Sequence, residues 1–140
     1  MNKTYTPIDH TGDLGVEVFG EDWRELFANA SWALTDTLVD AARVGMEIEA
    51  EWALEADGLE SLLVRQLEEI LYQMDARGRV YSEFQIEWLE PHALKCRARG
   101  EALDRKRHGF KTEIKAVTYH GLKLWREPEG PCRARIIFDV

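Results

Sequence analysis

Two stretches of the chain repeat apolar residues at the three- and four-residue spacing of an amphipathic helix, and each is predicted to be one. The first follows Asp22, which forms a capping signal with Glu25 three residues later. Its apolar stripe comprises Trp23, Leu26, Phe27, Ala30, Leu34 and Leu38. The second is predicted to open at Asp57, with Glu60 three residues on, and to end before Gly78, which suits the left-handed position after a helix. Its stripe comprises Leu59, Leu62, Leu63, Leu67, Ile70, Leu71 and Met74.

Elsewhere apolar and polar residues alternate, which predicts half-buried strands. These strands span residues 14–19, 46–54, 80–88, 94–102, 113–125 and 132–140. The turn residues around Pro91 predict a hairpin, across which Glu87 and Lys95 are expected to pair, a contact worth about 0.2–1 kcal/mol.

The alternation also assigns side chains to faces. It places Trp88 and Ala102 in the core and leaves Tyr81 on the outer face. It also buries His120 on the same face as Ile114, where a hydrogen-bonded core histidine is the usual interpretation.

The order strand, helix, strand, helix and then several strands predicts an α+β fold. We expect a two-layer sandwich, with two helices packed on one face of a mostly antiparallel sheet. A length of 140 residues, 45% hydrophobic and 31% charged, fits a single globular domain over residues 1–140. The repeated strand-helix-strand order leaves an internal duplication open, although the side chains do not show one.

The net charge of −8 argues against a general nucleic-acid binder, because phosphate neutralisation needs a surplus of lysine and arginine; a local basic patch stays open. Cys96 and Cys132 form no Cys-x-x-Cys motif and are expected to be buried, reduced thiols. The first residues hold no apolar signal core and no run approaches a membrane span, so we expect a cytoplasmic protein without membrane contact.

Two polar segments exceed what the strand pattern needs. The stretch Asp-His-Thr-Gly-Asp-Leu-Gly at 9–15, taken alone, favours a tight turn, and the alternative is an oxygen-rich site for a hard cation. The segment around Thr118 places Lys115 and Tyr119 together on one face, as a docking patch or as a solvated surface.

Two further segments each leave two interpretations. The last strand brings Asp139 beside the carboxylate of Val140, which suits a plain edge strand or a pair of cation ligands. The basic stretch 100–108 is either a solvated connection or a loop that faces protein or RNA.

Taken together, these segments resemble the archease family over essentially the whole chain. The resemblance is carried by the stretches DHTGDLG, GEALDRKRH, EIKAVTYHGLKL and IIFDV and by the helix after the first of them. One departure is Gly12, where the family more often has alanine; the change removes no ligand and gives the turn more backbone freedom to lose.

The resemblance implies a compact α+β sandwich that activates an RtcB-type RNA ligase, an enzyme of tRNA splicing and RNA repair that uses GTP and divalent metal. It implies that archease promotes the ligase–guanylate intermediate and multiple turnover without being an enzyme itself. The implied metal ligands are Asp13, Asp139 and the main-chain or terminal oxygens of Val140. We expect calcium there, with magnesium or manganese as alternatives. The residues expected to support the site are Asp9, His10, Lys115 and His120.

Two other functions stay open. One is a metal-dependent hydrolase of phosphoesters built on Asp13, His10 and His120, for which the spacing shows no nucleophile–base pair. The other is a general protein chaperone, for which the sequence lacks exposed apolar or disordered segments. RNA contact is expected to be indirect or local, since the ligase is the implied partner.

Overall fold

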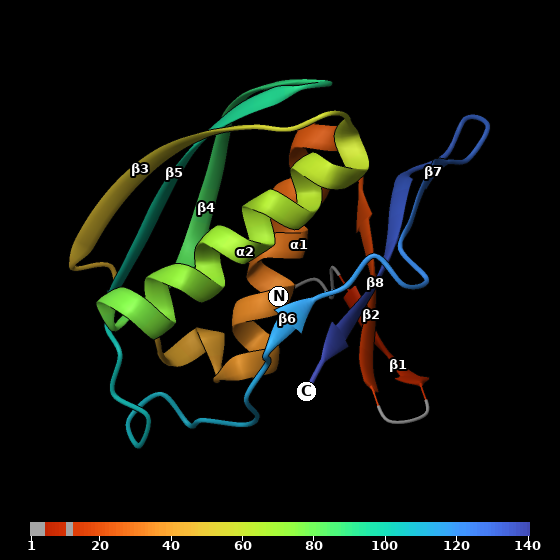
Figure 1. Ribbon diagram of the computed structural model, residues 1–140. Helices are drawn as coiled ribbons and strands as arrows, with labels where there is room; N and C mark the ends of the chain where they lie inside the picture. The colour runs from red at the N-terminus through yellow and green to blue at the C-terminus, as the bar shows by residue number, and fades with distance from the viewer. Residues whose placement is uncertain (1–4, 11–12) are drawn as a thin grey trace.

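The computed structural model describes the backbone of residues 5–10 and 13–140, and all their side chains except those of Asp9 and His10. Its helices are α1 (Trp23–Leu38) and α2 (Leu59–Arg77), with a short 3-10 turn, η1 (Ala41–Arg43) (Figure 1). Its strands are β1 (Tyr5–His10), β2 (Asp13–Gly20), β3 (Ile48–Glu55), β4 (Arg79–Glu90), β5 (Ala93–Ala102), β6 (Ala116–Val117), β7 (Lys123–Arg126) and β8 (Cys132–Asp139).

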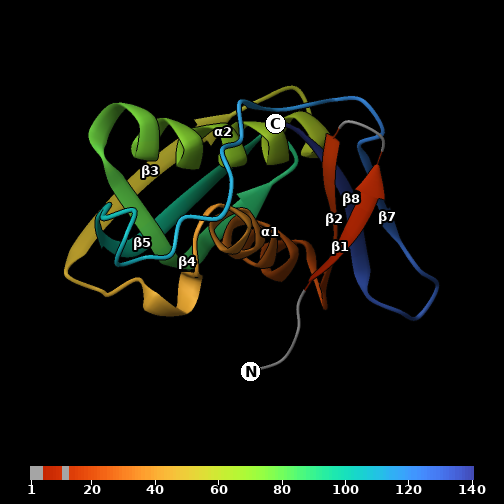
Figure 2. The ribbon, with the colours of Figure 1, turned by 90° about the horizontal axis from the view of Figure 1, so that it is seen from below.

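The strands form two antiparallel sheets, which confirms the α+β class but divides the expected sheet in two. One sheet has the order β1-β2-β8-β6, with β7 also paired to β8, and the other has the order β3-β5-β4. Helix α1 lies between the sheets and contacts β4 on one side and β2 on the other (Figure 2). Helix α2 packs on α1, β3, β4 and β6. The core therefore lies between the two sheets, around α1.

The helix signals in the sequence are largely confirmed. Asp22 caps α1 by accepting a hydrogen bond from the Glu25 amide at 2.8 Å. Gly78 ends α2 in the left-handed conformation, with φ of 62°. The start of α2 was misplaced: its cap is Gly58 rather than Asp57, because the Ser61 hydroxyl at the third helical position accepts the Gly58 N–H at 3.2 Å.

Register shifts in β4 place two of its side chains on the opposite face of the sheet from the predicted one. Shifts between Tyr81 and Glu83 and between Ile86 and Trp88 each displace the alternation by one residue. As a result Tyr81 is fully buried and Trp88 is 43% exposed, the reverse of the prediction. The predicted hairpin between β4 and β5 is confirmed, and Lys95 Nζ lies 3.9 Å from Glu87 Oε1 across it.

The predicted strand over 113–125 is broken. Its two ends, β6 and β7, both pair with β8, and residues 118–122 turn outward between them. Gly121 occupies this turn with φ of 70°, a conformation that L side chains rarely adopt. His120 lies on the same turn and is exposed, so the prediction that it is buried was wrong.

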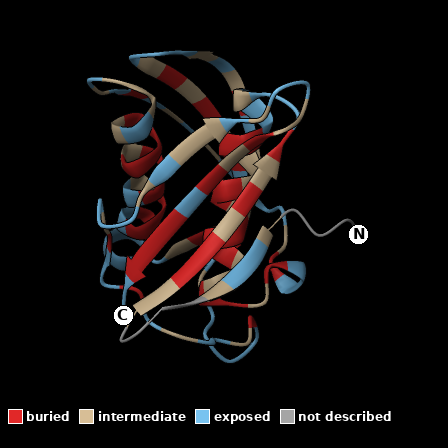
Figure 3. Ribbon diagram, turned by 90° about the vertical axis from the view of Figure 1, so that its right-hand side faces the viewer, coloured by how far each residue is buried: buried red, intermediate tan, exposed pale blue. Residues whose placement is uncertain are grey.

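Strand β8 is central rather than at the edge that its simplest interpretation suggested. It pairs with β2 on one side and with β6 and β7 on the other. Figure 3 shows the outer face of this sheet, with buried residues running along its middle strands. Strand β1, which the sequence did not predict, completes the sheet on the far side of β2.

A hydrogen-bonded polar chain crosses the apolar core. Gln66 on α2 accepts from the Trp52 indole at 2.8 Å and donates to the Ser31 hydroxyl at 3.0 Å. Its amide also lies 3.5 Å from the sulfur of Cys96, whose pKa is raised to about 12 by burial. Cys96 and Cys132 are both buried and unbridged, as predicted.

Strands β4 and β5 approach each other so closely at Gly100 that no larger residue fits there. A Cβ added there would lie 1.9 Å from the Val80 carbonyl oxygen, so a backbone would have to move. We expect Gly100→Ala to lower the free energy of unfolding by at least about 2 kcal/mol. Gly58→Ala, where a Cβ meets nothing within 4 Å, is the control and is expected to change it by less than about 1 kcal/mol. Equal urea midpoints for the two variants would contradict this account of Gly100.

Candidate functional site

Two acidic residues, Asp13 of β2 and Asp139 of β8, lie at one edge of the five-stranded sheet on strands that pair with each other. Leu14 pairs with Phe138 in the antiparallel register of β2 and β8, so one further step puts Asp13 opposite Asp139. Residues directly opposite each other in such a pair have Cβ atoms about 4.5–5.5 Å apart and point to the same face. The two side chains are therefore neighbours although they are far apart in the sequence.

The row continues across the neighbouring strands. His10 of β1 pairs with Asp13, and Ala116 of β6 pairs with Asp139. The Lys115 amide donates to the Asp139 carbonyl oxygen at 2.7 Å, so this oxygen is used within the sheet. The main-chain oxygens that remain for a cation at this end of β8 are those of Val140. We call this row the carboxylate edge: residues 10, 13, 139 and 140 with the adjoining 115–116.

The carboxylate edge is accessible to solvent. Asp139 and Lys115 are exposed, Val140 is 41% exposed and Asp13 is half-buried. Carboxylate and main-chain oxygens in such a place are the ligands that calcium, magnesium and manganese prefer. The geometry thus offers hard oxygen donors on one open face.

The turn at 118–122 lies over the same outer face. The Thr118 hydroxyl donates to the Ile137 carbonyl oxygen at 3.0 Å, and a Cβ on Gly121 would lie 3.3 Å from the Ile137 side chain. Ile137 and Asp139 project from the same face of β8, because alternate residues of a strand do so. His120, exposed on this turn, is therefore on the side of the sheet that carries the two carboxylates.

The structure brings together some of the predicted site residues and leaves others outside its described part. Lys115 is bound to Asp139, next to Val140, and the register of β2 and β8, extended by one residue, leads to Asp13 opposite Asp139. The side chains of Asp9 and His10, and all of Thr11 and Gly12, lie outside the described residues. Among residues whose side chains are described, no three or more His, Cys, Asp or Glu form a metal-holding group.

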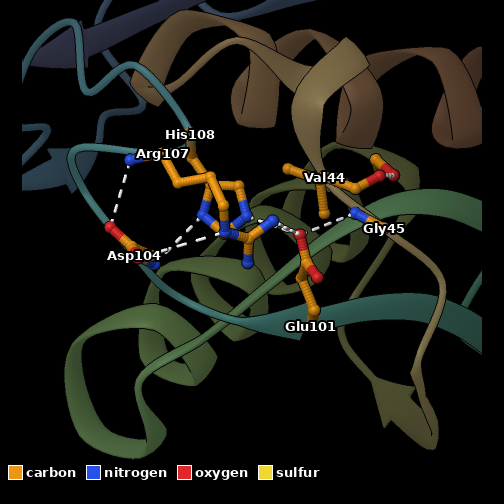
Figure 4. A network of polar contacts seen from close by, with 7 residues as sticks. Val44, Gly45, Glu101, Asp104, Arg107 and His108 are labelled. Carbon is orange, nitrogen blue, oxygen red and sulfur yellow. Dashed lines mark hydrogen bonds and ion pairs between the residues drawn. The ribbon is translucent and has the colours of Figure 1, made fainter.

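A second polar cluster surrounds Glu101 (Figure 4). Its charged side chains belong to the basic stretch 100–108, but the sequence did not predict that they would gather around a buried glutamate. One oxygen of Glu101, Oε1, accepts from the Gly45 amide at 2.8 Å and from Arg107 Nη1 at 2.9 Å. The same oxygen lies 2.6 Å from His108 Nε2, and the imidazole is fully buried. Three donors thus converge on one carboxylate oxygen beneath the surface.

The hydrogen bonds fix the tautomer of His108. Its Nδ1 accepts from the Asp104 amide at 3.0 Å, so in the neutral ring the proton is on Nε2, which donates to Glu101. The pKa of Glu101 is lowered to about 2, first by Arg107, then by the Gly45 amide and by His108. The cluster is therefore an ionised glutamate held by donors, one of them a neutral histidine.

Strand alternation did not predict this cluster, for a physical reason. Alternation placed Ala102 inside, whereas Ala102 is exposed and Glu101 is buried. Strand periodicity assigns the faces of a strand but does not say which loop will fold back over them, and here residues 103–108 cover Glu101. The available signal was an acidic residue followed within seven positions by Arg107 and His108.

The cluster ties down the chain between the two sheets, residues 103–115, which we call the crossover loop. The Asp40 amide donates to the His108 carbonyl oxygen and the Lys111 amide to that of Leu38, each at 2.8 Å. These bonds fasten the crossover loop to the end of α1. Beyond them the chain runs directly into β6 and the carboxylate edge (Figure 1).

The same architecture occurs in proteins of known structure. The solution structure of protein 1598 from Methanobacterium thermoautotrophicum matches with a TM-score of 0.79 and 28% identity, covering 98% of this chain and 99% of its own. The crystal structure of an archease from Thermotoga maritima, described as a possible chaperone, matches with a TM-score of 0.66 over both full chains. At 23% identity this second likeness shows the fold alone.

Sequence comparison gives the family. The model of the Archease protein family (MTH1598/TM1083) matches residues 5–140. Protein archease of Pyrococcus furiosus is 34% identical over 99% of both chains, and that of Methanopyrus kandleri is 37% identical over 95% of this chain and 96% of its own. This chain therefore belongs to the archease family, as its motifs indicated. In the described part of the chain, no helix has the length and apolarity to cross a membrane.

The depressed pKa of Glu101 predicts a pH dependence of stability. In the unfolded chain this carboxyl takes up a proton near its ordinary pKa of 4.5, but in the folded protein only near 2. Its contribution to the free energy of unfolding is thus fully present above pH 4.5 and is lost as the pH falls towards 2.

We expect wild type and Glu101→Gln to differ most in urea midpoint above pH 4.5 and to converge between 4.5 and 2. Glu83→Gln is the control, because Glu83 is exposed on β4 and its ion pair with Arg99 spans 3.8 Å. A difference between wild type and Glu101→Gln that stays constant across this pH range would contradict the assignment.

Proposed function

We propose that this protein is a metal-binding accessory factor that activates an RtcB-type RNA ligase. In this role it promotes formation of the ligase–guanylate intermediate and allows multiple turnover in tRNA splicing and RNA repair, in the cytoplasm. Membership of the archease family supports the proposal. The observation that carries it is the register of β2 and β8, whose extension by one residue from Leu14 and Phe138 leads to Asp13 opposite Asp139 at an accessible sheet edge.

Electrostatics favours a cation at this edge. Two negative charges on opposed strand positions repel each other, by an energy that decreases as the local dielectric constant rises. A divalent ion between them would replace repulsion by attraction, with the oxygens of Val140 as further ligands. Calcium suits this set best because it accepts six to eight oxygens in flexible geometry, whereas magnesium and manganese demand more regular sites.

The proposed action is on the ligase and not on a substrate of this protein's own. The carboxylate edge would deliver its cation to the guanylylation site, or would order that site by contact with the exposed Lys115 and Tyr119. A net charge of −8 agrees with docking against a ligase whose own site must handle GTP and RNA phosphates.

A second candidate function is a chaperone of broader range. Its support is shared family membership: the family that includes this chain also includes the Thermotoga maritima archease TM1083, which is described as a possible chaperone. It predicts that the protein suppresses aggregation of unrelated, thermally unfolded clients at stoichiometric amounts. Protection of two such clients without any effect on ligation would favour this candidate over ligase activation.

Asn substitution at the two carboxylates tests the metal site. We expect Asp13→Asn and Asp139→Asn each to weaken calcium binding in calorimetric titration by about tenfold or more, because each removes a charged ligand. Asp57→Asn, on an exposed residue before α2, is the control that loses one negative charge elsewhere. Unchanged calcium affinity in both site variants would rule out this set of ligands.

The same variants test the activation. With limiting ligase, GTP and cleaved tRNA, wild type and Asp57→Asn are expected to raise the number of turnovers, whereas the two site variants are not. No effect of the wild-type protein on turnover would defeat the proposal. Phosphoester hydrolysis by the protein alone, lost in Asp13→Asn, would replace it with the hydrolase function.

A further inference from the structure

Positive charge on this acidic protein is concentrated in one segment. Residues 103–112 hold four of the 18 lysines and arginines but one of the 26 acidic residues. Within this segment of the crossover loop, residues 105–107, 110 and 111 are exposed. Between them lie His108, which is buried, and Gly109, which is half-buried. We call residues 105–111 the basic loop.

Two cations of the basic loop have no carboxylate partner among the residues that the structure describes. Arg107 is bound to Glu101, and Lys111 Nζ donates to the Asp36 carbonyl oxygen at 2.8 Å. By contrast, Arg105 and Lys106 are exposed and form no ion pair with any residue that the structure describes. Their charges are available to a ligand.

Arg105 does have one neighbour, and it is aromatic. Its guanidinium lies 4.4 Å from the centre of the Phe110 ring, and Phe110 is 37% exposed. A backbone bond from the Phe110 amide to the Arg105 carbonyl oxygen, 2.9 Å long, holds the two residues together. The pair presents a planar cation lying over an apolar ring at the surface.

The underside of the basic loop is fixed in place. His108 is fully buried, Glu101 is 5% exposed, and both are hydrogen-bonded as described above. A loop that only connects two sheets through solvent needs no buried ionised group such as Glu101, because burying a charge costs stability through desolvation. A loop held in one shape loses little conformational entropy when it binds, which is the advantage that such a tie gives to a binding surface.

We propose that the basic loop binds single-stranded nucleic acid. Arg105 and Lys106 contact successive phosphates, and a base stacks on the Arg105–Phe110 pair. Arg107 contributes less, because Glu101 partly neutralises its charge. An acidic protein surface would bind only the cations of the basic loop and would not need the aromatic ring of Phe110. The exposed guanidinium–aromatic pair favours a polynucleotide, because unpaired bases stack on such planes in single-strand binding proteins.

The size of the effect follows from the number of phosphates. Each phosphate neutralised in a single strand contributes about −0.7 to the slope of log affinity against log salt, so two to three contacts give about −1.4 to −2.1. Binding by the protein alone is weak. It gains strength when a partner already holds the strand nearby, since the second contact is then intramolecular.

Fluorescence anisotropy with a labelled oligouridylate and the purified protein, without any ligase, tests the proposal. Salt is varied from about 30 to about 300 mM. Arg105→Ala/Lys106→Ala is expected to weaken binding at low salt by about tenfold and to flatten the slope by about 1.4. Phe110→Ala is expected to weaken it about fivefold or more with the slope unchanged, since stacking carries no counterion release.

The control is Arg65→Ala/Arg126→Ala, which removes the same charge from exposed or half-exposed positions on α2 and β7. Equal losses in the control and in Arg105→Ala/Lys106→Ala would overturn the proposal, as would an unchanged affinity in Phe110→Ala. Competition by polyglutamate as strong as by unlabelled oligouridylate would also overturn it, in favour of an acidic protein partner. A DNA strand of the same length is expected to bind as well as RNA, because the loop's contacts do not involve the 2′-hydroxyl.

The buried tie has a separate variant. His108→Ala removes the donor to Glu101 and is expected to weaken binding while leaving the salt slope unchanged, because the phosphate-binding cations remain. His108→Gln is expected to restore part of the affinity, since an amide can donate to Glu101 and accept from the Asp104 amide. Arg105, Lys106 and Phe110 are surface residues, so their variants decide the matter even if the His108 variants unfold. The outcome does not depend on ligase activation.

Discussion

The pairing of β8 on both sides is the constraint on which the rest of this structure depends. Strand β2 fixes one side of it, and β6 and β7 fix the other, so its backbone is held in register as far as Asp139. A slip of one residue would turn every side chain of β8 to the opposite face and bring Phe138 out of the core. The burial of that core therefore also sets the position of Asp139 opposite Asp13.

The crossover loop links this edge to the other polar feature of the molecule. It leaves the three-stranded sheet at β5, is held by the Glu101 cluster, and arrives at β6 beside Asp139. The crossover loop thus carries the basic loop and ends beside the edge to which β2 and β8 contribute carboxylates, so the two features have charges of opposite sign. Such a division suits a protein that meets a cation and a polyanion together, as an accessory factor of RNA ligation would.

Periodicity and caps predicted the elements whose packing is local. Both helices, the β4–β5 hairpin and β8 follow from apolar spacing and turn residues. The broken strand over 113–125 and the exposure of His120 could not be predicted this way, because the break is imposed by β8 and permitted by Gly121. Of the candidate site, the sequence supplied the residues through resemblance, but only the register of β2 and β8 brings Asp13 against Asp139.

The central claim is that Asp13 and Asp139 share one cation, and thermal unfolding with and without calcium tests it most directly. A shared site predicts that calcium raises the midpoint of wild type but not of Asp139→Asn or of the variant with both substitutions. It also predicts that, in chelator, Asp139→Asn unfolds no lower than wild type, because substitution relieves the repulsion between two opposed carboxylates. An equal calcium-induced rise in wild type and Asp139→Asn would contradict the account.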